Sequence, residues 1–197
     1  YMKVILFIIV IVIIIGSFVI AMSNPRDSVR IDENANIDDI TINQDINMDT
    51  LKLTSSVFEH NGKIPSRYTC DGDGVNPKLE INGVDESAKS LVLIMDDPDA
   101  PSGTWDHWVK FNIATTTTKI DEATEPDGIA GVGTSDNKDY LGPCPPDKEH
   151  RYFFKLFSLS TMLELEEGAT KKQVESAMEG HILQQTELIG LYERNNE

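Results

Sequence analysis

The sequence is poor in cysteine and lacks the motifs of several common enzyme classes. Its two cysteines, Cys70 and Cys144, form no CxxC pair and no Cys/His spacing typical of a zinc site. Neither GxSxG nor HExxH occurs, which argues against a hydrolase nucleophile elbow and a zinc-protease helix. The run GIAGVG has the wrong glycine spacing for a dinucleotide site, and Val75 and Asn76 stand where a calcium loop needs an acidic ligand and a glycine. We therefore expect no metal, no cofactor and no enzymatic activity.

Basic residues are also scarce. The chain has 17 lysines and arginines against 33 acidic residues, and its formal net charge is −16. A surface of this charge repels nucleic acid and anionic lipid faces. We therefore expect no nucleic-acid partner, and any bound anion must be held by local geometry rather than by the overall field.

The first 22 residues differ from the rest of the chain. The run from Val4 to Met22 carries no charge, and at about 1.5 Å per residue it nearly spans a bilayer core of about 30 Å. It predicts one transmembrane helix that anchors the protein in a membrane. A cleaved secretory signal is the alternative, because Ala21 and Ser23 are small residues spaced like a cleavage site. In either case we expect the following domain to be extracytoplasmic, either membrane-anchored or secreted.

Residues 23–50 are acidic and rich in asparagine, without a sustained hydrophobic period. This composition predicts a mostly disordered tether. An extra edge strand is the alternative, and its apolar positions would be Ile37, Ile40, Ile42 and Ile46. The folded domain is then expected to span residues 51–197.

Strand patterns dominate that domain. We expect strands at Leu51–Phe58, Ser90–Met95, Trp105–Ile113, Arg151–Ser160 and Glu187–Arg194. Long loops are expected at 59–78 and 114–140 because these stretches are rich in turn-forming residues. Thr170 and Gln173 fit a capping box at the start of an amphipathic helix. The class is therefore mostly antiparallel β with helical attachments.

The unusual local chemistry gathers near the ends of the expected strands, at residues 96–101, 105–108 and 143–152. Loops at strand ends often build binding pockets. His107 and His150 can each donate a hydrogen bond to an anion, and Asp97 can orient an imidazole. Strict alternation along 105–113 places His107 on one face with Trp105, Val109, Phe111 and Ile113. Taken singly, each histidine is better explained as a core residue, and it is the pairing of each with a proline-rich loop that favours a binding role.

Four segments, in this order, resemble one known family: KIPSRYTCDG (63–72), DDPDAPSGTWDHW (96–108), GPCPPDKEHRYFFKLFSL (142–159) and EGATKKQVESAMEGHIL (167–183). From about Leu51 to Arg194 the chain resembles the phosphatidylethanolamine-binding protein family, in its bacterial and archaeal Raf-kinase-inhibitor-like branch. The resemblance implies a β-sandwich with a large central antiparallel sheet, a smaller second sheet and peripheral helices. In this chain that domain would follow the N-terminal transmembrane helix.

The resemblance also implies an anion pocket. Its residues would be Asp97, Ala100, Pro101, Trp105, His107, Gly142, Pro145, Pro146, His150 and Tyr152. Arg151 alternates away from that face, so we expect it to form a structural ion pair. Cys70 and Cys144 fall in loops that flank the implied pocket, and we expect a disulfide between them.

These expectations together indicate a non-catalytic binding or regulatory domain that recognises a small anion, such as phosphate or a phospholipid headgroup. One alternative is an inhibitor of a kinase or protease that acts through protein contacts with an unknown partner. A hydrolase built from Asp97, His107 and His150 is the less favoured alternative, because the sequence shows no evident nucleophile or metal set.

Overall fold

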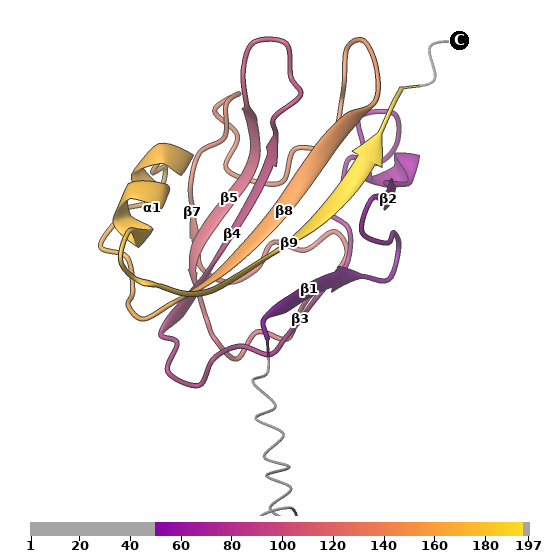
Figure 1. Ribbon diagram of the computed structural model, residues 1–197. Helices are drawn as coiled ribbons and strands as arrows, with labels where there is room; N and C mark the ends of the chain where they lie inside the picture. The colour runs from indigo at the N-terminus through magenta and orange to yellow at the C-terminus, as the bar shows by residue number, and fades with distance from the viewer. Residues whose placement is uncertain (1–49, 195–197) are drawn as a thin grey trace, which may run out of the picture. The chain divides into compact units, whose positions relative to one another are not determined.

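The computed structural model describes residues 50–194, and most of its elements are labelled in Figure 1. The strands are β1 (Lys52–Ser55), β2 (Gly62–Lys63), β3 (Leu79–Asn82), β4 (Ser90–Asp97), β5 (Trp105–Ile113), β6 (Lys119–Ile120), β7 (Ile129–Ala130), β8 (His150–Leu159) and β9 (Ile182–Tyr192). The helical elements are the 3-10 turn η2 (Ser66–Tyr68) and the α-helix α1 (Lys171–Met178). The expected anchor at 1–22, the tether at 23–50 except Thr50, and the alternative edge strand all lie outside the described residues. No helix within 50–194 is long and apolar enough to cross a membrane.

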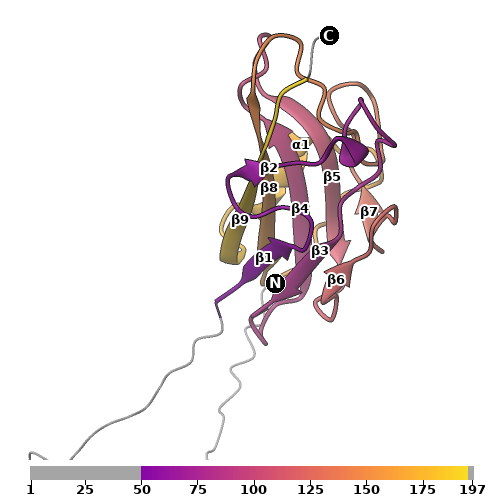
Figure 2. The ribbon, with the colours of Figure 1, turned by 90° about the vertical axis from the view of Figure 1, so that its right-hand side faces the viewer.

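The strands form two sheets. The six-stranded sheet has the order β2-β9-β8-β4-β5-β7, and the three-stranded sheet has the order β1-β3-β6. Figure 2 shows β1 and β3 in front of the large sheet and α1 behind it. The expected pair of sheets is thus present. The large sheet is antiparallel except at one edge, where β2 pairs parallel with β9.

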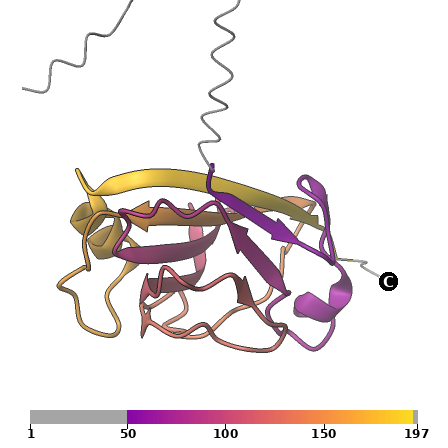
Figure 3. The ribbon, with the colours of Figure 1, turned by 90° about the horizontal axis from the view of Figure 1, so that it is seen from below.

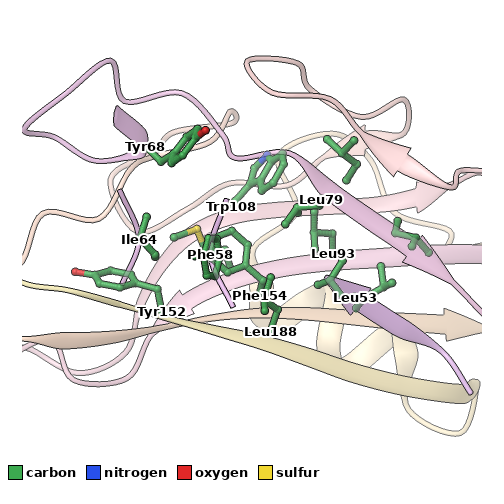
Figure 4. Close-up of a cluster of buried hydrophobic side chains, with 14 of the residues drawn as sticks. Leu53, Phe58, Ile64, Tyr68, Leu79, Leu93, Trp108, Tyr152, Phe154 and Leu188 are labelled. Carbon is green, nitrogen blue, oxygen red and sulfur yellow. The ribbon is translucent and has the colours of Figure 1, made fainter. Parts of the chain in front are cut away.

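The strand β4 explains why the domain has two cores. Its apolar side chains alternate: Leu93 faces the three-stranded sheet, whereas Val92 and Ile94 face α1. The core between the sheets also holds Trp108 and Phe154 (Figure 4). A strand buried on both faces must be apolar throughout, and the continuous run SLVLIM meets this requirement.

The helix α1 begins as the sequence predicts. The Thr170 hydroxyl accepts a hydrogen bond from the backbone N–H of Gln173, and the Gln173 side chain accepts one from the backbone N–H of Thr170. The capping box is therefore confirmed. Val174 and Met178 are buried against the large sheet. In Figure 3 this helix and η2 lie at opposite ends of the domain, so α1 is remote from the loops around η2.

Two irregularities in β5 change which of its side chains lie on each side of the large sheet. Met95 pairs with Trp108 and Asp96 pairs with Asp106, so His107 is an extra residue in a bulge. A second shift lies near Asn112, whose φ is 56°. As a result, Val109 and Phe111 pack on the α1 side, whereas Trp108 and Ile113 pack between the sheets. The prediction that Trp105, His107, Val109, Phe111 and Ile113 share one face was wrong.

The two stretches expected to be loops contain short strands. Residues 59–78 hold β2 and η2, and residues 114–140 hold β6 and β7. Each of these strands is two residues long and exists only through its partner, as in the pairing of Lys110 with Ala130. Local sequence carries no signal for such strands because a two-residue segment has no period.

Candidate functional site

A cavity of about 540 Å³ lies where β4 ends, β5 begins and β8 begins. Its lining residues are Cys70, Gly74, Asp97, Ala100, Pro101, Ser102, Trp105, His107, Tyr140, Leu141, Gly142, Cys144, Pro146, His150 and Tyr152. Among the expected pocket residues, only Pro145 does not line it. Pro145 is buried whereas its neighbour Pro146 is exposed. Pro145, expected as a pocket residue, therefore lies outside the lining of the cavity.

Four lining residues were not expected: Gly74, Ser102, Tyr140 and Leu141. Ser102 lies within the recognised DDPDAPSGTW turn, so its place beside Pro101 offered a signal. Tyr140 and Leu141 lie where the loop 114–140 returns to the domain, and no local pattern marks them. The hydroxyl of Tyr140 donates to the backbone carbonyl of Tyr68, at 2.8 Å. This bond joins two distant loops, and Tyr140 lines the cavity.

His150 is fixed between two carboxylates. Its Nδ1 lies 2.7 Å from Oδ2 of Asp97, and its Nε2 lies 2.9 Å from Oδ1 of Asp147. A carboxylate only accepts hydrogen bonds, so both contacts are satisfied at once when the ring is an imidazolium. Burial by itself lowers the pKa of His150, but the hydrogen bonds to Asp97 and Asp147 outweigh it and the pKa lies above its usual value. The expected orientation of an imidazole by Asp97 is confirmed.

The aspartate turn is tied to the start of β8. Asp97 Oδ1 accepts a hydrogen bond from the backbone N–H of Asp99, at 2.8 Å. Asp99 in turn accepts from Nε and from an Nη of Arg151, at 2.8 and 2.7 Å. These bonds hold the pKa of Asp99 at about 2. Arg151 therefore forms the expected structural ion pair, and it does not line the cavity.

His107 has a different environment from His150. Only 4% of it is exposed, and its Nδ1 lies 2.8 Å from the carbonyl oxygen of Leu141. Burial lowers the pKa of His107, and this effect exceeds the opposing effects of the Leu141 carbonyl and of nearby carboxylates such as Asp97. The ring packs edge-on against Tyr152, with 5.3 Å between the ring centres. The two histidines of one cavity are thus shifted in opposite directions.

The hydroxyl of Tyr152 forms no close hydrogen bond. The residue is fully buried, and within the part of the chain that the structure describes its hydroxyl makes only weak polar contacts, to the Asp97 carboxylate and to the backbone N–H of Cys144. Figure 4 shows the hydroxyl pointing away from the packed side chains of Phe154 and Leu188. Burial, together with the charge of Asp97, raises the pKa of Tyr152 well above its usual value, so the phenol keeps its proton. It therefore remains a hydrogen-bond donor at the wall of the cavity.

A disulfide joins Cys70 to Cys144 beside the cavity, with 5.4 Å between the Cα atoms. The backbone N–H of Cys70 also donates to the carbonyl of Pro143, at 3.0 Å. Gly142 lies so close to the η2 segment that a Cβ at this position would be 2.8 Å from the carbonyl oxygen of Tyr68. A glycine is needed here because the two backbones approach each other directly.

The two-sheet fold, with a cavity at one end of its large sheet, is that of a mostly β binding domain. The family model described as "Phosphatidylethanolamine-binding protein" matches residues 54–193. A UPF0098 protein of Methanothermobacter thermautotrophicus is 51% identical over 150 residues, which are 73% of this chain and 99% of the relative. A UPF0098 protein of Chlamydia pneumoniae is 45% identical and covers 74% of this chain and all of its own. The chain therefore belongs to the phosphatidylethanolamine-binding protein family.

Two solved structures support the same conclusion. A Chlamydia trachomatis protein described as a phosphatidylethanolamine-binding protein homologue superposes with a TM-score of 0.73 at 39% identity. It covers 75% of this chain and 99% of its own length. Escherichia coli YbcL, described as a member of the mammalian family, has a TM-score of 0.68 at 26% identity and covers 74% and 99%. The expected family is confirmed.

Proposed function

We propose that this domain is a binding module that takes a small anionic group, such as phosphate or a phospholipid headgroup, into the cavity. The observation that carries the proposal is the Tyr152 hydroxyl, a buried donor that forms no close hydrogen bond and belongs to a residue lining the cavity. An unsatisfied buried polar group destabilises a fold by about 1 to 3 kcal/mol. An anion oxygen within hydrogen-bonding distance would satisfy it.

His150 would supply a second donor. Its Nε2 is held by the carboxylate of Asp147, whose side chain is 53% exposed. An oxygen of Asp147 thus occupies the position that an oxygen of a bound anion would take. A charge-assisted donor of this kind is favourable for phosphate oxygens. Binding at His150 would displace Asp147 into solvent.

The size and lining of the cavity favour an anion attached to an organic group. Its volume of about 540 Å³ is that of a pocket for a small organic molecule. Trp105, Pro101 and Pro146 provide apolar walls beside the polar end. A phosphate ester headgroup would place its phosphate at Tyr152 and His150 and its organic part against these walls.

Titration of the domain with inorganic phosphate and with phosphoethanolamine, followed by calorimetry, tests the proposal. We expect saturable binding of both, with the ester tighter because it also fills the apolar part of the cavity. Tyr152→Phe should weaken binding by about tenfold, since it removes one donor to a charged group. Tyr192→Phe is the matched control, because the Tyr192 hydroxyl bonds Asp71 outside the cavity.

Two further results would contradict the proposal. One is unchanged affinity when His107 and His150 are both replaced by alanine in a domain that still folds. The other is turnover of a phosphomonoester or carboxylic ester that disappears in His107→Ala, which would indicate a hydrolase instead.

A further inference from the structure

Besides the donors of Tyr152 and His150, the cavity presents hydrogen-bond acceptors to a ligand. Among its lining residues, all of them within 50–194, there is no lysine or arginine, and Asp97 contributes a carboxylate. Each oxygen of Asp97 already accepts one hydrogen bond, from the N–H of Asp99 and from His150. A carboxylate oxygen has a second lone pair. Asp97 can therefore accept a further hydrogen bond from a ligand, and its charge opposes a second negative charge in the cavity.

His107 is a second acceptor. The carbonyl of Leu141 can only accept, so Nδ1 must carry the hydrogen of this 2.8 Å bond. Within the described residues Nε2 makes no hydrogen bond, and in the neutral ring it is a lone pair. Burial favours the neutral ring, since it lowers the pKa of His107. A bare anion oxygen placed against this nitrogen would meet a lone pair instead of a hydrogen.

Charged and titratable groups reach His107 from each strand around it. They are Asp96 and Asp97 of β4, Asp106 of β5, Tyr152 and His150 of β8, and Tyr140 of the loop before β8. Lys171 binds Asp96 and Asp106, at 2.7 and 2.9 Å, and so offsets part of their charge. The carboxylate that lines the same cavity is Asp97, and its charge is offset only by His150.

We infer that the cavity selects an anion that carries its own acidic hydrogen, such as the monoanion of a phosphate monoester, over a fully ionised anion of the same shape. This inference rests on the proposed anion site. The ligand O–H donates to His107 Nε2 or to Asp97, while its other oxygens accept from Tyr152 and His150. A sulfate monoester is tetrahedral and singly charged but has no hydrogen to donate. In the sulfate complex the two acceptors would face oxygen atoms, and unpaired buried acceptors strongly disfavour binding.

Methyl phosphate and methyl sulfate form a matched pair for the test, titrated by calorimetry between about pH 5.5 and 8. Because the second pKa of a phosphate ester is about 6, methyl phosphate is mostly a monoanion at the acidic end of this range, as methyl sulfate is throughout. We expect methyl phosphate to bind about tenfold tighter at the acidic end. The preference should shrink as methyl phosphate loses its hydrogen.

Equal affinity for the two esters at the acidic end would overturn the inference and leave the proposed anion site intact. A methyl sulfate affinity that falls with rising pH in parallel with methyl phosphate would also overturn it, because a histidine would then supply the hydrogen. If neither ester binds at any pH, both the proposed function and the inference are wrong.

Replacement of His107 adds a second readout. His107→Phe removes the Nε2 acceptor and keeps a ring against Tyr152, so the ratio of the two affinities should fall. Methyl sulfate should bind as well as before or better, a result that general damage to the cavity would not produce. His181→Phe, outside the cavity, should leave the ratio unchanged. An unchanged ratio in a folded His107→Phe domain would exclude His107 as the acceptor that discriminates the esters.

Discussion

The carboxylate of Asp147 lies 2.9 Å from Nε2 of His150, three residues along the chain. The histidine is fully buried, whereas the aspartate side chain is half-exposed. Asp147 can thus move into solvent, whereas His150 is held in place by Asp97. Asp147 therefore acts as an internal competitor for any anion that would bind His150.

Replacing this competitor should strengthen binding. We expect Asp147→Asn to raise the affinity for phosphoethanolamine by about fivefold, because an amide is a weaker partner for an imidazolium than a carboxylate. Calorimetry at constant pH and salt measures the change. Asp136→Asn removes the same charge from an exposed loop position and should change affinity much less. A similar gain in both variants would show that only the net charge matters.

The two histidines should titrate in opposite directions from the usual value of 6.5. NMR titration of the ring protons should give a pKa above this value for His150 and below it for His107. Because the pKa of His150 is raised by folding, its contribution to stability is complete below about pH 6.5 and is lost as pH rises through the raised value. The opposite order of the two pKa values would contradict the observed hydrogen bonds.

The ion pair between Arg151 and Asp99 should contribute to stability except at strongly acid pH. The pKa of Asp99 is lowered from 3.8 to about 2, so its contribution is present above about pH 4 and is lost as pH falls towards 2. We expect Arg151→Met to be less stable than the wild type near neutrality and to approach it near pH 2. Urea denaturation at several pH values measures this difference. A pH-independent difference would assign the effect of Arg151 to packing.

We expect the disulfide to stabilise the domain, and we expect the cavity to keep its shape when the disulfide is reduced. Cys70 and Cys144 are 74 residues apart, and closing a loop of this length stabilises a fold by about 4 kcal/mol in the chain-entropy model. We expect reductant to lower the urea midpoint of the wild type and to leave the double serine variant unaffected. The Cys70–Pro143 backbone bond also joins the two loops, so we expect anion affinity to change little on reduction. Mass spectrometry that finds two free thiols in the oxidised protein would contradict the bridge.

Local patterns predicted the long elements of the fold because each has a signal that one segment displays by itself, such as a continuous apolar run or a capping motif. The run SLVLIM became the doubly buried strand β4, and Thr170 with Gln173 became the cap of α1. The short strands β6 and β7 were missed because their only support is a partner strand. The parallel edge formed by β2 was missed for the same reason.

For the candidate site, the family resemblance assigned Asp97, His107, His150 and Tyr152 to one pocket. The structure places all four around one cavity. The residues that close the cavity from elsewhere were not predicted. Tyr140 reaches it through a bond to the carbonyl of Tyr68, 72 residues away. No local pattern encodes a contact over such a separation.

The sequence alone determined the residue types of the candidate site, the strand ends on which they lie and the family of the chain. Only the tertiary structure decided that Asp97 holds His150 across 53 residues, that a bulge brings His107 and Trp108 to the same side, and that the Tyr152 hydroxyl forms no close hydrogen bond. The physical reason is that hydrogen-bond partners and strand register are set by which strands become neighbours. The alternation along a single strand contains no information about either.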